Sequence, residues 1–157
     1  MTADENILKI LDVEPQAAQD DAPEYRLQEQ IGFLLRKAQQ RHVAIFAAHI
    51  PEVTPPQFAA LAKLGEVDET SQNQLGALVA MDAATIKGVI DRMRARGLVT
   101  VSKDEADKRR LMVSLTPEGR TALAGFLANA KKVTGETLSP LNAREAQQLA
   151  RLLARIG

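Results

Sequence analysis

Residues 83–96 have the pattern of a helix that could read DNA. Apolar residues recur at Ile86, Val89, Ile90 and Met93, which would place them on one face and anchor the helix to its domain. The opposite face is small or polar, as entry into the major groove requires, because Ala and Thr methyl groups can meet thymine methyl groups and basic side chains can reach base edges or phosphates. The candidate DNA-contacting residues of this helix are Ala83, Ala84, Thr85, Lys87, Gly88 and Arg92.

The same helix also has a simpler interpretation. Lys87 and Asp91 are four residues apart, which is the spacing of an ion pair on any solvent-facing helix. On spacing alone, the two interpretations weigh about equally. The segment that follows the helix favours DNA.

That segment, residues 103–110, is a charged run between two stretches rich in β-branched residues, 98–102 and 111–115, which predicts a β-hairpin with a charged tip. An Arg held by a neighbouring carboxylate is aimed in advance, and a narrow minor groove attracts a guanidinium. Asp107 is the candidate orienting residue for Arg109, with Lys108 and Arg110 as further DNA-binding candidates. A charged tip can also be a solubilising loop, but its place directly after a DNA-reading helix favours the minor groove.

A third group of polar residues interrupts an apolar stripe. Apolar residues recur every three or four positions from Glu24 to about His49, which predicts one long helix, yet Arg41, His42 and His49 fall near its apolar face. They could bind a ligand. They could instead be helix-packing histidines and a salt-bridging arginine, which for any one residue is the more frequent situation.

Charge is distributed unevenly along a chain whose formal net charge is +0. Residues 1–30 hold eight acidic and two basic residues, a net charge of −6, whereas residues 87–110 hold eight basic and four acidic residues, a net charge of +4. Because phosphate binding responds to a local basic surface, the neutral average does not exclude nucleic acid.

The remaining elements follow from capping residues. Thr54-Pro55 and Thr116-Pro117 begin helices, with Gly65 expected to stop the first; Ser71 caps 72–79, Asp82 caps 83–96 and Asn142 caps the last helix. The order is four helices, a hairpin and two helices. The sequence therefore predicts a mainly α fold with a small β-hairpin wing, a winged helix-turn-helix flanked by terminal helices.

Length and composition narrow the function classes. The chain of 157 residues is the size of one domain, contains no Cys, and has no run of the roughly 18 apolar residues that span a membrane, so we expect a cytoplasmic protein without disulfides. Two His seven apart form a poor metal site, and phosphate-binding loops and catalytic triads are missing. We expect no enzymatic activity, no cofactor and no metal.

Several motifs in order resemble the MarR family of bacterial transcriptional regulators. They are residues 75–78, the helix 82–93, Arg96-Gly97-Leu98-Val99, the wing 107–110, and 113–119. The resemblance covers about residues 25–157 and implies an obligate homodimer, a DNA-reading helix and wing in each subunit, and repression relieved by a small ligand. The expected parts are an acidic N-terminal arm over 1–22, a helical dimerisation region over 23–50 and 117–157, and a DNA-binding domain over 54–116.

The resemblance also implies an effector pocket beside the first helix, where Phe46 and Phe58 could wall an aromatic ring and Arg41 or His42 could hold an anionic group. Residues 34–42 look like those of regulators of aromatic-acid catabolism, whose effectors are aromatic carboxylates or their CoA thioesters; Arg36 could then meet CoA phosphates. The candidate ligand-binding residues are Arg36, Arg41, His42, Phe46, His49 and Phe58.

Long apolar stripes on the terminal helices exceed what a small winged helix can cover, which independently favours a homodimer. The predicted function is a ligand-responsive repressor on a pseudo-palindromic operator of double-stranded DNA. The alternative is a winged-helix protein-interaction module without sequence-specific DNA binding.

Overall fold

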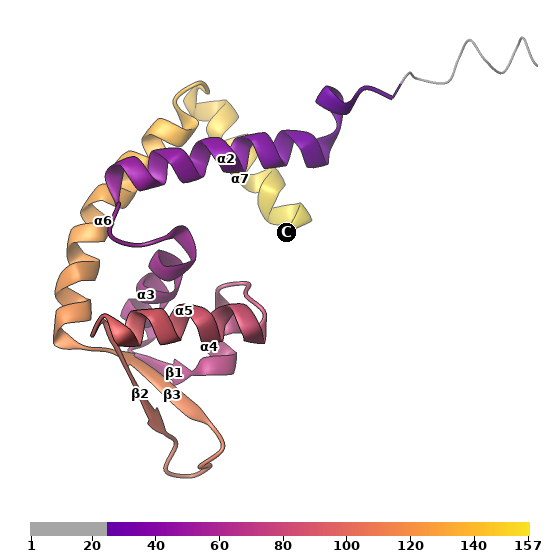
Figure 1. Ribbon diagram of the computed structural model, residues 1–157. Helices are drawn as coiled ribbons and strands as arrows, with labels where there is room; N and C mark the ends of the chain where they lie inside the picture. The colour runs from indigo at the N-terminus through magenta and orange to yellow at the C-terminus, as the bar shows by residue number, and fades with distance from the viewer. Residues whose placement is uncertain (1–24) are drawn as a thin grey trace, which may run out of the picture. The chain divides into compact units, whose positions relative to one another are not determined.

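The structure is a computed structural model that describes residues 25–157, so the predicted acidic arm over 1–22 lies outside the described residues. The described residues divide between two units, with 25–37 in the first and 38–157 forming the second. Figure 1 shows the elements, which in chain order are η1 (Leu27–Glu29), α2 (Ile31–His49), α3 (Pro55–Val67), β1 (Glu69–Ser71), α4 (Gln72–Leu78), α5 (Ala83–Ala95), β2 (Val99–Lys103), β3 (Leu111–Leu115), α6 (Pro117–Leu138) and α7 (Ala143–Ile156).

The first helix is shorter than the sequence predicted. Instead of one helix from Glu24, a 3-10 turn over Leu27–Glu29 precedes α2, and Gln30 between them has extended backbone. Gln30 satisfies the turn locally, because its Nε2 donates to the carbonyl oxygen of Arg26 at 3.0 Å and its backbone N–H donates to that of Leu27 at 3.1 Å. These bonds replace the helical ones that the apolar spacing predicted.

Every predicted helix cap is present. The side chains of Thr54, Ser71, Asp82, Thr116 and Asn142 each accept a hydrogen bond from the backbone N–H three residues later. Because each cap satisfies an N–H that a helix start leaves unpaired, these residues fix where five helices begin.

Gly65 does not end its helix, contrary to the prediction. Helix α3 continues to Val67 and ends at Asp68, whose φ is 64°. Gly65 lies instead against α6, where a Cβ would be 2.7 Å from the Cδ2 atom of Leu123. This glycine is therefore where α3 and α6 approach closely.

The hairpin is part of a three-stranded antiparallel sheet of order β1-β3-β2. The sequence predicted β2 and β3 but missed β1, whose Thr70 pairs with Val113 while Val101 pairs with Val113 from the other side. In Figure 1 the hairpin of β2 and β3 projects beyond α3, α4 and α5, and α6 begins at its base. The fold is a winged helix-turn-helix, as predicted.

The core lies between the helices and the sheet. Ile86, Val89, Ile90 and Met93 of α5 are at most 1% exposed, as the spacing predicted, and Gly97 ends the turn after α5 with a φ of 72°. Two leucines predicted for apolar stripes are instead exposed, Leu78 in the last turn of the short α4 and Leu127 on α6. The inner face of α4 is formed by Leu75 and Gly76.

Helix α7 is amphipathic, yet none of its residues is buried. Its large apolar residues are exposed to differing degrees, by 38–42% at Leu149, Leu152 and Leu153 and by 69% at Ile156. Among residues 25–157, no helix combines the length and apolar character needed to cross a membrane.

Candidate nucleic-acid interface and effector pocket

Helix α5 presents its predicted reading face to solvent. Asp82 begins the helix by accepting the Thr85 backbone N–H at Oδ1, 2.7 Å away. This bond stabilises the ionised carboxylate and lowers the pKa of Asp82 below its ordinary value. Ala83, Ala84, Thr85, Lys87 and Arg92 are all exposed, with Gly88 half-buried between them.

Two contacts shape the basic part of this face. Lys87 Nζ lies 2.6 Å from Asp91 Oδ2, so the ion pair of the simpler interpretation is present. Arg92 lies along the helix toward Gly88, where a Cβ would be 3.4 Å from its Nη1 atom. Since the Lys87 and Asp91 side chains are more than half exposed, water screens the pair and leaves Lys87 able to exchange its partner for a phosphate.

The wing tip is organised by two aspartates. Asp107 Oδ1 accepts from the backbone N–H of Arg109 at 3.0 Å and from its Nε at 3.3 Å. Asp104 Oδ1 accepts from the Ala106 N–H at 2.8 Å, a bond that lowers the pKa of Asp104. Its Oδ2 lies 3.7 Å from Arg110 Nη1. The predicted pair of Asp107 and Arg109 is thus formed in the structure.

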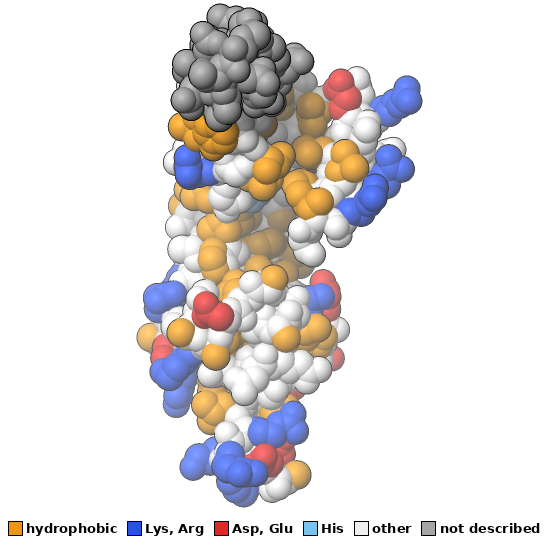
Figure 2. Space-filling model, turned by 90° about the vertical axis from the view of Figure 1, so that its right-hand side faces the viewer, with side chains coloured by type: hydrophobic (Ala, Val, Ile, Leu, Met, Phe, Trp, Pro, Cys, Tyr) orange, Lys and Arg blue, Asp and Glu red, His pale blue; other side chains and the backbone are white. Residues whose placement is uncertain are grey.

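Basic side chains gather at the wing. Figure 2 shows Lys and Arg side chains clustered at the end of the molecule where the hairpin of Figure 1 turns, with acidic groups among them. The basic residues of this turn are Lys103, Lys108, Arg109 and Arg110, and the Arg109 side chain is 93% exposed. A phosphate or a groove edge can therefore reach the Arg109 guanidinium without rearrangement of the loop.

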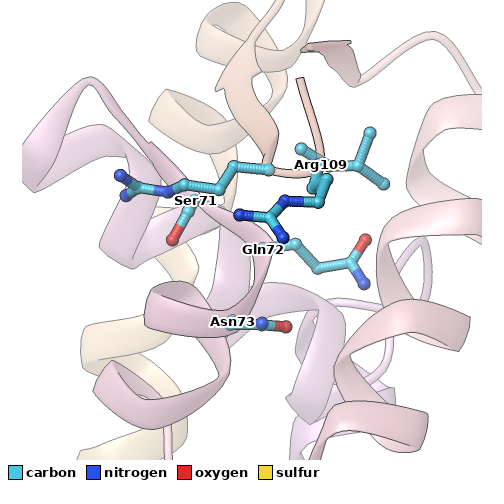
Figure 3. A pocket seen from close by; sticks show the side chains of 6 residues that line it. Ser71, Gln72, Asn73 and Arg109 are labelled. Atoms are coloured by element: carbon cyan, nitrogen blue, oxygen red, sulfur yellow. The ribbon is translucent and has the colours of Figure 1, made fainter. Parts of the chain in front are cut away.

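A polar pocket of about 330 Å³ lies between the wing and the start of α4, lined by Ser71, Gln72, Asn73, Arg109, Arg110 and Leu111. In Figure 3, Ser71, Gln72 and Asn73 lie at the start of α4 and Arg109 comes from the hairpin. The strand pairing of β1 with β3 brings these segments together, since Ser71 is opposite Met112. Two cationic and three neutral polar side chains suit a phosphate.

Gln72 and Asn73 were not among the predicted site residues. Ser71 was predicted as the cap of α4. Gln72 and Asn73 follow this cap directly, on the first helix of the helix-turn-helix. Polar residues at that position were the sequence signal for a phosphate contact. The pairing of β1 with β3 was not predicted from the sequence, and only this pairing places Gln72 and Asn73 next to the wing.

The polar residues of α2 contact the last turn of α6. Arg41 donates from Nη1 to the Thr137 carbonyl oxygen at 2.5 Å and from Nη2 to that of Glu136 at 2.9 Å. His49 Nε2 lies 2.6 Å from Glu136 Oε2. His42 Nδ1 lies 3.0 Å from Thr137 Oγ1. Arg41 thus bonds two carbonyls in the last turn of α6, and that of Glu136 also accepts from the backbone N–H of Ser139 at 3.2 Å and from its hydroxyl at 2.9 Å.

A small cavity of about 170 Å³ lies between α2, α3 and α6, lined by His42, Phe46, Pro55, Phe58, Ala130, Val133 and Thr134. The Phe46 and Phe58 rings meet edge to face, with centroids 5.7 Å apart at 63°. The His42 ring is tilted against Phe46 at 6.4 Å. The walls are apolar and aromatic, and polar groups come from His42 and Thr134, a combination typical of small-ligand sites.

Three of the six predicted ligand-binding residues therefore line one cavity: His42, Phe46 and Phe58. Arg41 and His49 are not in its lining and instead bond to α6. Arg36 belongs to the first unit, described over residues 25–37, where its guanidinium lies 5.7 Å from the centroid of the Phe33 ring. Ligand contact by all six residues stays a prediction.

Comparisons with known proteins agree with this architecture. The model of the MarR family matches residues 53–111. The chain is 38% identical over 144 residues to the HTH-type transcriptional repressor NicR of Pseudomonas putida, covering 90% of this chain and 91% of NicR. It is also similar to a solved structure of a probable transcriptional regulator from Pseudomonas aeruginosa, with 53% identity, a TM-score of 0.81, and coverage of 84% of this chain and 100% of that one.

A further solved structure is that of BpsR from Bordetella bronchiseptica, whose DNA binding is regulated by 6-hydroxynicotinic acid. It is 40% identical to this chain with a TM-score of 0.81, and the match covers 84% of this chain and 96% of BpsR.

Proposed function

Because this chain belongs to the MarR family, we propose that it is a homodimeric transcriptional repressor that a small aromatic acid, or the CoA thioester of one, releases from a pseudo-palindromic operator. The observation that carries the proposal is the reading face of α5 beside a wing whose exposed Arg109 is held by Asp107. The similarity to the repressor NicR supports the direction of regulation. Because a repressor must reach the bacterial chromosome, the proposed location is the cytoplasm.

On DNA, each part has a distinct role. The small residues at the start of α5, Ala83 to Thr85, would contact base edges in the major groove, and Lys87 and Arg92 would contact bases or phosphates. Arg109 would enter the adjacent minor groove, with Lys108 and Arg110 on its phosphates. The DNA-binding domain would span 54–116.

The dimer would form through the terminal regions, 23–50 and 117–157. Ile31, Leu34 and Leu35 on α2 are 41–66% exposed, and the apolar residues of α7 are 38–69% exposed. Amphipathic helices of a folded protein do not usually leave such faces to water, so a second copy that covers them would stabilise both chains. Two-fold symmetry would then place the two α5 helices about one turn of DNA apart.

The effector would bind in the cavity lined by His42, Phe46 and Phe58. Its volume of about 170 Å³ accepts a single ring, so a CoA thioester would insert its acyl part alone. The relative BpsR responds to 6-hydroxynicotinic acid, a compound of this size class. Because α6 begins at the base of the wing and contacts the cavity, the bound state would favour a dimer whose reading helices no longer match the operator.

The first experiment is fluorescence anisotropy with DNA from the intergenic region upstream of the gene and a scrambled duplex of the same composition. We expect tight binding to the first alone, an affinity that falls steeply with salt, and release by an aromatic acid or its CoA thioester. Equal weak binding to both duplexes would leave either an operator elsewhere or a protein-interaction module, and a weak binding that does not fall with salt would favour the module. Binding that is specific but released by none of the compounds would contradict only the effector class.

A further inference from the structure

We infer that Thr137 is a positioning residue of the effector cavity: its hydroxyl donates to Nδ1 of His42 and thereby commits the ring to present an Nε2–H donor. The inference rests on the proposed function, since an oriented donor serves a cavity that binds a ligand. It assigns a role at the cavity to a residue at the end of α6 that does not itself line it.

The direction of the bond follows from the partners available. The Oγ1 of Thr137 lies 3.0 Å from His42 Nδ1 and makes no other hydrogen bond within residues 25–157. By contrast, the hydroxyl of Thr121, four turns earlier on α6, donates to the Pro117 carbonyl oxygen at 3.1 Å. A half-buried hydroxyl donates where an acceptor is in reach, and a neutral imidazole has one acceptor nitrogen. With Nδ1 accepting, the proton of neutral His42 is on Nε2.

The surroundings hold both partners in place. Arg41, the residue before His42, bonds the main-chain carbonyl of the same Thr137 and that of Glu136. Two consecutive residues of α2 therefore bond Thr137 of α6. Arg41 bonds its backbone carbonyl, and His42 bonds its side-chain hydroxyl. The Phe46 ring is tilted at 54° to the imidazole, with 6.4 Å between the two centroids.

The consequence is a preference for one ligand chemistry. Within residues 25–157, the cavity lining includes neither Lys nor Arg, so the His42 Nε2–H and the Thr134 hydroxyl are its side-chain donors. The site would select a single aromatic ring whose acceptor, a carboxylate or a ring carbonyl, reaches the imidazole N–H. In this arrangement Thr137 sets the affinity without touching the ligand.

The test begins with imidazole nitrogen NMR on the full-length protein without ligand. The chain has two histidines, so a His49→Gln variant assigns both rings. We expect a single Nε2–H tautomer for His42 in the wild type, nitrogen shifts averaged between tautomers in Thr137→Val, and the wild-type pattern restored in Thr137→Ser. Thr121→Val, which removes a hydroxyl of the same helix far from His42, should leave the pattern unchanged.

Calorimetric titration with 6-hydroxynicotinic, nicotinic, 4-hydroxybenzoic and benzoic acids then measures affinity. Loss of the bond should weaken the best of these about fivefold in Thr137→Val, with recovery in Thr137→Ser. Operator affinity without ligand should not change in either variant.

The failures are distinguishable. An Nδ1–H tautomer in the wild type, or a His42 spectrum that Thr137→Val leaves unchanged, overturns the inference, as does equal ligand affinity in both proteins. A wild type that binds operator DNA but none of the four acids overturns the proposed effector class and this inference together. If Thr137→Val does not fold, as judged by circular dichroism, the wild-type and Thr137→Ser tautomers decide.

Discussion

Asp107 holds Arg109 through a single carboxylate oxygen, which accepts both the backbone N–H of Arg109 at 3.0 Å and its side-chain Nε at 3.3 Å. The same atom thus shapes the turn and directs the guanidinium. Both terminal nitrogens of Arg109 stay unbonded within residues 25–157, on a side chain that is 93% exposed. Asp107 therefore fixes the Arg109 side chain through Nε while both terminal N–H groups remain available to DNA.

This pairing predicts a loss of specificity rather than of binding when Asp107 becomes Asn. The substitution removes the charge that directs Arg109 and also removes a negative charge from the DNA-facing tip. We expect operator affinity to fall about fivefold while affinity for scrambled DNA stays equal or rises. Anisotropy on both duplexes measures the ratio. Glu105→Gln is the matched control, because Glu105 makes no hydrogen bond or ion pair within residues 25–157.

Removing the cation itself should have a larger effect. Arg109→Ala should weaken operator binding about tenfold or more and flatten its salt dependence, because a charge-assisted contact and a displaced counterion are lost together. Dimer mass and thermal midpoint should not change, since the side chain is exposed. Unchanged operator affinity would refute the placement of the wing on DNA.

Filling the small cavity should separate the two proposed activities. Ala130 is half-buried in the cavity wall, so Ala130→Phe would occupy space meant for the ligand ring. We expect intact operator binding that aromatic acids no longer release. Ala124→Phe, at an exposed position of the same helix, is the control. Release that survives Ala130→Phe would place the effector elsewhere.

Gly119 should tolerate no side chain. A Cβ there would be 1.9 Å from the carbonyl oxygen of Leu98, which already accepts the Thr116 N–H at 3.1 Å. Gly119→Ala should therefore lower the free energy of unfolding by about 3 kcal/mol, as forced overpacking does. Gly125→Ala, with no heavy atom within 4 Å, should instead stabilise α6 by up to about 1 kcal/mol. Urea unfolding of both variants checks the contrast.

Asp82 should make stability depend on acid pH. The Thr85 N–H lowers its pKa in the folded chain below the ordinary 3.8. The unfolded chain therefore takes up the proton first, and the contribution of this cap, present above pH 3.8, is lost as the pH falls through the lower folded pKa. Asp82→Asn keeps a capping oxygen without titrating. The difference in thermal midpoint between the two proteins should change only below about pH 4, and a difference independent of pH would contradict this assignment.

Local features of the fold were predictable from sequence, and nonlocal ones were not. The caps at Thr54, Ser71 and Asp82 involve atoms three residues apart, so the residue types alone indicated them. Strand β1 is a three-residue segment without apolar alternation, and it forms because β3, more than forty residues later, supplies its partners. Gly65 was misread for the same reason, because its neighbour Leu123 lies on a distant helix.

The candidate sites divide in the same way. Asp107 and Arg109 are two residues apart, and their pairing was predicted. Arg41 was predicted as a ligand contact from its place in the apolar stripe. Its partners in the structure are main-chain oxygens 95 and 96 residues away, and a pattern of side-chain types cannot predict a bond to a main-chain oxygen. The contact between the Thr137 hydroxyl and His42, 95 residues apart, could not be predicted from the sequence either.

The tip of the wing is stabilised by hydrogen bonds between residues of the wing itself. Pairing of β2 with β3 ends at Lys103 and Leu111, and beyond it the turn is fastened by its own bonds, from Asp104 N–H to the Arg110 carbonyl and from Arg110 N–H to that of Asp107. Changes of length or sequence within residues 105–109 therefore leave the core untouched. Exchanging residues 105–109 between related proteins should therefore alter how the wing contacts the minor groove while the base contacts of α5 stay in place.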